Sequence, residues 1–130
     1  MCQLAKLQTN FNTSVEVAEN KLGLINHVIL CAAKCAKIDA IILFGSALSN
    51  NCSEKSDIDL AIISSYSIND LSKNKSFAEF KKNVYLQDMS QEYDFLYFHS
   101  LEEIERKKKE HMICDELSKK GKVIYRKQVA

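Results

Sequence analysis

The sequence predicts a single α/β (α+β) domain in which helices pack on a mixed β-sheet. Segments with helical periodicity alternate along the chain with short apolar runs that are typical of strands. Hydrophobic residues make up 46% of the 130 residues, which is enough to form one buried core. Proline is absent and only three glycines occur, so no change in composition marks a linker. We therefore interpret residues 1–130 as one domain.

The first predicted element is an amphipathic helix that begins near Asn12, with Thr13 or Ser14 as its cap. Apolar residues recur there at intervals of three and four, at Val15, Ala18, Leu22, Ile25, Ile29 and Ala32. The next element, residues 38–44, is a continuous apolar run that ends at Gly45, as expected of a buried strand.

A second strand is predicted over residues 56–63, where polar and apolar residues alternate. A helix with a charged outer face is expected over residues 69–83. Residues 93–98 are aromatic and strongly β-prone, and they form the third predicted strand.

The last predicted elements are a helix over residues 100–120 and a short strand over residues 123–125. Ser100 and Glu103 have the spacing of a capping box at the start of this helix, and Gly121 follows its end.

Bulk charge and cysteine content give no sign of a membrane or nucleic-acid partner. The net charge is +1, and no apolar run approaches the length of a membrane span. The basic run at residues 106–109 is interleaved with glutamates, so we expect a solvated helix face there and no direct nucleic-acid binding. Five cysteines without zinc-ligand spacing indicate reduced thiols and a cytoplasmic protein.

The pair Gly45-Ser46 lies where the first predicted strand ends. A glycine at such a position lets the backbone approach an anion closely, and the neighbouring amides and the Ser46 hydroxyl can bind phosphate oxygens. Asp57 and Asp59 follow on the second strand, where the two-residue period places both carboxylates on one face, about 7 Å apart. Hard cations prefer such oxygen ligands, and magnesium is the expected ion.

Asp94 is the candidate for a third carboxylate. It stands in an otherwise apolar strand, where an unpartnered charge is costly, so a cation or a hydrogen-bonding partner is expected beside it. With three carboxylates the site could hold two magnesium ions, one at the attacking oxygen and one at the leaving pyrophosphate.

These motifs together resemble the signature of the polymerase-β-type nucleotidyltransferase superfamily, and more narrowly its minimal nucleotidyltransferase group. The resemblance rests on Gly45-Ser46, the ten residues that separate Ser46 from Asp57 and the sequence Ser56-Asp57-Ile58-Asp59-Leu60, and the element order extends it over nearly the whole chain. It implies catalytic and metal-binding roles for Asp57, Asp59 and Asp94.

The resemblance also implies that Gly45, Ser46 and Ser56 bind the nucleotide. It further implies a magnesium-dependent enzyme that transfers AMP from ATP to a protein tyrosine. Many proteins of this group are antitoxins of a toxin-antitoxin pair, so the implied partner is a HEPN-type toxin. A partner subunit or a self-dimer is expected to close the cleft.

One departure from the family pattern keeps an alternative open. The loop after Gly45-Ser46 usually contains arginine and a further glycine, whereas residues 47–50 are Ala-Leu-Ser-Asn. Lys55 is the loop cation that could compensate. The alternative is a non-catalytic nucleotide-binding antitoxin that neutralises its partner by occlusion, and a third possibility is an enzyme acting on a small molecule such as an aminoglycoside.

Overall fold

Two apolar segments in the middle of the chain form the central strands of a four-stranded sheet. β3 (Ala40–Phe44) is buried throughout, and β4 (Ile58–Ile63) is buried except at Asp59. The strand order is β5-β4-β3-β6, with β4 and β5 parallel and the other two pairs antiparallel. The computed structural model, which describes residues 3–128, therefore has the mixed sheet flanked by helices that the sequence predicts.

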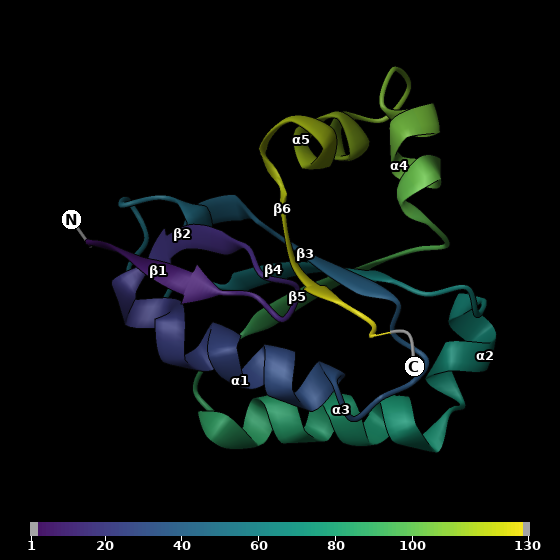
Figure 1. Ribbon diagram of the computed structural model, residues 1–130, viewed down its shortest axis with the longest axis horizontal. Coiled ribbons are helices and arrows are strands. Elements are labelled where there is room, and N and C mark those ends of the chain that lie inside the picture. The colour runs from purple at the N-terminus through teal and green to yellow at the C-terminus, as the bar shows by residue number, and fades with distance from the viewer. Residues whose placement is uncertain (1–2, 129–130) are drawn as a thin grey trace.

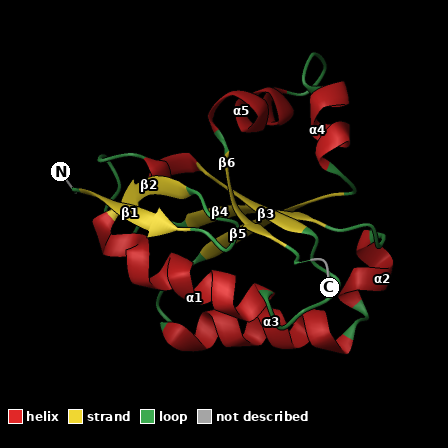
Figure 2. Cartoon of the chain, in the orientation of Figure 1, coloured by secondary structure: helices red, strands yellow, loops and turns green. Residues whose placement is uncertain are grey.

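The remaining elements surround this sheet (Figure 1, Figure 2). The other strands are β1 (Leu4–Gln8), β2 (Ser14–Ala18), β5 (Tyr93–Phe98) and β6 (Lys122–Arg126). The α-helices are α1 (Leu22–Ala32), α2 (Ile68–Ser72), α3 (Lys75–Gln87), α4 (Leu101–Lys107) and α5 (Met112–Lys120). Two short 3-10 helices are η1 (Glu19–Lys21) and η2 (Gly45–Leu48).

Helices cover both faces of the sheet, and the alternation along β4 decides which residues meet which helices. Ile58, Leu60 and Ile62 belong to the larger core, to which α1 and α3 contribute, and these two helices lie side by side in Figure 1. Ala61 and Ile63 belong to a smaller core beneath α4 and α5. Asp59 shares the face of Ala61, so its carboxylate lies on the α5 side of the sheet.

The prediction of a helix from Asn12 is wrong in its first part. Residues 14–18 form β2, which pairs with β1 in an antiparallel hairpin, and the α-helix begins only at Leu22. Because Val15 and Val17 alternate with polar residues, the segment also has a strand period, and pairing with β1 selects it. Thr13 therefore lies in the hairpin turn and caps no helix.

Two long predicted helices are each divided in two. The segment at residues 69–83 becomes α2 and α3, and a new helix begins where the Asn74 side chain accepts a hydrogen bond from the Phe77 amide (3.0 Å). The segment at residues 100–120 becomes α4 and α5, separated by a turn at residues 108–111. One-turn interruptions preserve the apolar periodicity, which is why the pattern did not reveal them.

The other element predictions are confirmed to within two residues. The strand at residues 93–98 has the predicted bounds. The Ser100 hydroxyl accepts from the Glu103 amide (3.1 Å) as predicted, while the Glu103 carboxylate accepts from the His99 amide (2.8 Å). Gly121 follows the end of α5.

Four of the five cysteines lie within residues 3–128, at positions 31, 35, 52 and 114, and all four are free thiols buried in the fold. Cys2 lies outside the described residues. None of the helices in residues 3–128 has the length and apolar character needed to cross a bilayer.

Candidate active site

The Gly45-Ser46 turn and Asp59 occupy the same end of the sheet and are in direct contact. β3 ends at Phe44, which is paired with Asp59 on β4. Gly45 then takes a left-handed backbone conformation (φ 77°) that side-chain-bearing residues rarely adopt. A Cβ atom at Gly45 would collide with the Asp59 carboxylate. The backbone therefore approaches the carboxylate as closely as only glycine allows.

Asp59 and Asp94 form a carboxylate pair because β4 and β5 are parallel and in register. Asp59 is the direct partner of Asp94 in that register, and adjacent strands are about 4.8 Å apart. The two carboxyl groups are close enough that Asp59, when protonated, donates a hydrogen bond to Asp94. Asp94 is exposed on β5, which is an edge strand, so this side of the pair is open to solvent.

Asp57 and Ser56 lie outside the strand, at the end of the loop that precedes β4. Asp57 is exposed, and its negative charge acts on Asp59 from outside the close pair. The Ser56 hydroxyl accepts a hydrogen bond from the Ser53 amide (2.8 Å), so it stabilises the loop. Within residues 3–128 no group of three or more His, Cys, Asp or Glu side chains is arranged to hold a metal ion. The structure thus pairs Asp59 with Asp94 across two strands, while Asp57 directly precedes β4 and acts on Asp59 through its charge.

The surroundings of Asp59 favour its protonated form. Burial is the main cause that raises the pKa of Asp59 to about 6. The hydrogen bond that protonated Asp59 donates to Asp94 and the negative charges of Asp94, Asp57 and Glu116 act in the same direction. A carboxylate crowded by like charges is the situation that a bound cation relieves.

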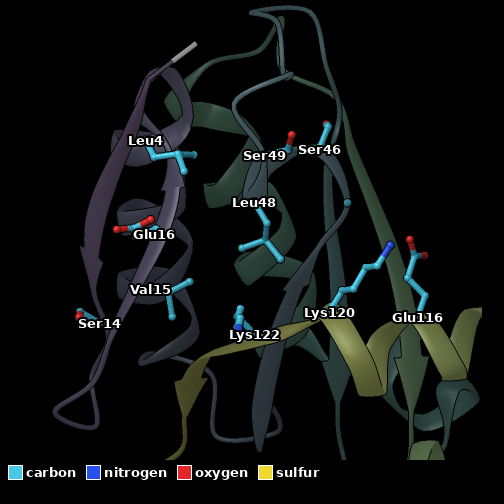
Figure 3. A pocket seen from close by; sticks show the side chains of 11 residues that line it. Leu4, Ser14, Val15, Glu16, Ser46, Leu48, Ser49, Glu116, Lys120 and Lys122 are labelled. Carbon is cyan, nitrogen blue, oxygen red and sulfur yellow. The ribbon is translucent and has the colours of Figure 1, made fainter. Parts of the chain in front are cut away.

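A cleft of about 870 Å³ opens beside this turn, as Figure 3 shows. One wall is the β1–β2 hairpin, which contributes Leu4, Ser14, Val15 and Glu16. The middle is the η2 turn with Gly45, Ser46, Leu48 and Ser49. The opposite wall is the junction of α5 and β6, which contributes Glu116, Lys120 and Lys122. Lys55, the predicted compensating cation, is exposed, and it is not among the described residues that line this cleft.

The tip of the hairpin is hydrogen-bonded to β6, the strand that begins in the opposite wall of the cleft. The Asn10 side chain donates to the Arg126 carbonyl (2.6 Å) and accepts from the Arg126 amide (2.9 Å). The Gln128 side chain donates to the Asn10 carbonyl (2.8 Å).

Sequence reasoning missed a buried lysine that supports the loop before Asp57. Lys21 is 1% exposed, and its ammonium donates to the Glu54 carbonyl (2.9 Å) and to the Gln91 side-chain oxygen (2.6 Å). The Gln91 side chain in turn donates to the Ser56 carbonyl (2.9 Å). Lys21 falls within the segment predicted as helix, where a lysine is ordinarily solvated, so no signal in the sequence marked it.

The Asp59–Asp94 pair fits a magnesium ion bound together with a nucleotide. Magnesium is held in such sites by one or two carboxylates, with phosphate oxygens and water as the other ligands. Two hard oxygen donors whose charges repel each other are therefore a sufficient protein contribution.

Comparison with known families agrees with this geometry. The family model described as "Polymerase beta, Nucleotidyltransferase" matches residues 26–129. No curated protein matches the chain. The matched residues include the Gly45-Ser46 turn and all three aspartates, and they cover most of the 130 residues. The chain belongs to the polymerase-β-type nucleotidyltransferase family.

Proposed function

We propose that this nucleotidyltransferase uses magnesium to transfer AMP from ATP to a hydroxyl group of a protein. The observation that carries the proposal is the contact of the Gly45 backbone with Asp59, which is itself paired with Asp94. A turn that can bind phosphate therefore lies beside two carboxylates that can bind a hard cation. A nucleoside triphosphate with its metal ion needs both.

The proposed reaction forms a bond between the acceptor oxygen and the α-phosphorus. The bond from the α-phosphorus to the oxygen bridging to the β-phosphorus breaks, and pyrophosphate leaves. In this scheme the Gly45-Ser46 turn binds the phosphates, Asp57, Asp59 and Asp94 provide the carboxylates, and Asp94 accepts the hydroxyl proton. Magnesium, when bound, would neutralise triphosphate charge and make the acceptor hydroxyl more acidic.

The open side of the pair supports an acceptor carried on a macromolecule. Asp94 is exposed on the edge strand β5, so a side chain of a folded partner can reach it without entering an enclosed pocket. We propose a tyrosine of a HEPN-type toxin as the acceptor, with the chain acting as antitoxin. The support for this partner is the resemblance to minimal nucleotidyltransferases.

The test is to incubate the protein with ATP, magnesium and a HEPN-type toxin as the proposed partner, and to measure the partner's mass. We expect a mass gain of one AMP on a partner tyrosine. Asp94→Ala and Asp59→Asn should each reduce the rate by about 100-fold or more, because each removes a carboxylate from the pair. Complex formation, followed by size-exclusion chromatography, should be unchanged.

Asp88→Asn is the matched control for these substitutions. Asp88 is an acid in the loop after α3 whose carboxylate accepts from the Ser90 amide and hydroxyl (3.0 and 2.6 Å). Its removal should leave the rate of AMP transfer within a few-fold of wild type. Equal losses in all three variants would contradict the assignment of Asp59 and Asp94.

One observation favours a second candidate function. Residues 47–50 contain no cation, which supports a protein that neutralises its partner by occlusion. In that case the partner would be inhibited without any gain in mass, and Asp94→Ala would inhibit it as well as wild type does.

A further inference from the structure

Residues 47–50 lack the arginine of the family pattern, and the buried part of the η2 turn has little room for such a side chain. Ala47 is fully buried, so a long cationic side chain there would have to displace the core. Because residues 47–50 contain no cation, any positive charge that contacts a triphosphate at Gly45-Ser46 must come from another part of the chain.

The pairing of β3 with β6 brings a second element to this turn. Leu43 on β3 is the partner of Lys122 on β6, and the two strands are antiparallel. The residues before Lys122 therefore run alongside the residues after Leu43, which are Phe44 and then Gly45. Lys120 and Lys122 thus flank the phosphate-binding turn, although they lie far from it in sequence.

The corner between α5 and β6 is packed tightly against β3, which fixes the backbone between the two lysines. A Cβ atom at Gly121 would lie 2.7 Å from the Ile42 methyl group and 2.7 Å from the Leu117 carbonyl. The corner therefore lies directly on β3, and only glycine fits there without displacing a neighbour.

Both lysines face the cleft and remain available to an anion. Lys120 and Lys122 line the same cleft as Gly45 and Ser46, and Figure 3 shows the Lys120 side chain extending along the wall beside Glu116. Neither lysine forms an ion pair with another residue of the range 3–128. Lys119, by contrast, is not among the residues that line this cleft and pairs with Asp115 (3.1 Å).

We infer that Lys120 and Lys122 bind the β- and γ-phosphates of the nucleoside triphosphate, in place of a loop arginine. This inference rests on the proposed function and names two further binding residues for it. An ammonium group attracts a phosphate oxygen as a point charge, and two of them facing one turn select a triphosphate over a monophosphate.

A third charged residue of the cleft, Glu116, should oppose the binding of a triphosphate. It lines the same cleft and its charge acts on Asp59, so it repels an incoming triphosphate. Replacing Glu116 with glutamine should therefore tighten binding, whereas replacing either lysine should weaken it.

The experiment measures binding to the full chain by titration calorimetry with magnesium, using the four nucleoside triphosphates, AMP and inorganic triphosphate as probes. The variants are Lys120→Ala, Lys122→Ala, their double variant, Glu116→Gln and Lys119→Ala. Lys119→Ala removes the same charge from the adjacent position outside the cleft, and Gly121 is left untouched so that the corner remains folded.

Lys120→Ala and Lys122→Ala should each weaken binding of the preferred triphosphate by about three- to tenfold, and the double lysine variant by about 30-fold, whereas Glu116→Gln should tighten it. Lys119→Ala should bind within twofold of wild type, and AMP binding should change little in any variant. Raised ionic strength should weaken wild type more than the double variant.

Two failures are distinguishable. If wild type binds a triphosphate and the double variant binds it equally well, or if Lys119→Ala weakens binding as much, the inference is overturned and the proposed function stands. If wild type binds none of the triphosphates, both are overturned.

Discussion

At Gly45 the backbone adopts a left-handed conformation directly against a carboxylate. The conformation costs a residue with a side chain about 1–2 kcal/mol, and here a Cβ atom would also collide with Asp59. The glycine thus serves two purposes, since it allows the turn and leaves space for the acid.

Gly45→Ala should therefore lower the free energy of unfolding by at least about 1–2 kcal/mol and abolish triphosphate binding. Denaturant unfolding and calorimetry would measure the two effects.

Gly23→Ala is the matched control, because no atom lies within 4 Å of a Cβ added at that helical position, and it should stabilise the protein by about 0.5–1 kcal/mol. In an Asp59→Ala background the collision disappears and only the backbone cost should remain; an unchanged penalty would show that Asp59 does not cause it.

Residue types at the site were predictable from the sequence, while their contacts were not. Gly45 after an apolar run and Asp59 on an alternating strand are local patterns. The pairing of Asp59 with Asp94 depends on the register between strands that are more than 30 residues apart, which no local pattern encodes. Asp57 follows the same alternation, yet it precedes the first paired residue of β4 and lies outside the close pair.

On the scale of elements, the main error concerns the segment that forms the hairpin. Apolar residues at positions 15 and 18 continue the helical period of α1, so periodicity alone extends the helix too far. Pairing with β1 and burial of Val17 against the core outweigh that local preference. The consequence for the site is large, because this hairpin forms one wall of the cleft.

A second feature on this scale is the loop between η2 and β4, which the buried Lys21 stabilises through hydrogen bonds. Lys21→Met removes an ammonium from the Glu54 carbonyl and from the side-chain oxygen of Gln91, and Gln91 is buried. We expect a loss of about 1–3 kcal/mol in unfolding free energy and faster amide hydrogen exchange over residues 53–57.

The partner substitution provides the control for Lys21. Gln91→Leu should be destabilising alone, and the double variant should cost less than the sum of the two single variants, because both act on one hydrogen-bond network. Strict additivity would argue against the network. Lys6→Met, at an exposed lysine on β1, should leave exchange in residues 53–57 unchanged.

On the scale of the whole molecule, the site makes stability depend on pH and magnesium. The folded state raises the pKa of Asp59 to about 6, against an ordinary value of 3.8, mainly through burial and then through Asp94. The folded state therefore holds this proton more tightly than the unfolded state. Stability should fall as pH rises from about 4 to about 6 and then level off, because above that range folding confines an ionised, crowded carboxylate.

Asp59→Asn should remove this dependence and raise the free energy of unfolding at pH 7.5 by about 1–2 kcal/mol without magnesium, a figure reduced for solvent screening. The gain should shrink as the pH falls towards 4 and vanish below about pH 3, where wild-type Asp59 is protonated in both states. Glu79→Gln, at an exposed carboxylate on α3, should show no such gain. Denaturant unfolding at pH 4, 5, 6 and 7.5 measures each difference.

Magnesium added at pH 7.5 should stabilise wild type and leave Asp59→Asn nearly unchanged, since a cation that binds only the folded site shifts the equilibrium towards it. Equal stabilisation of both proteins by magnesium would place the bound cation elsewhere in the molecule.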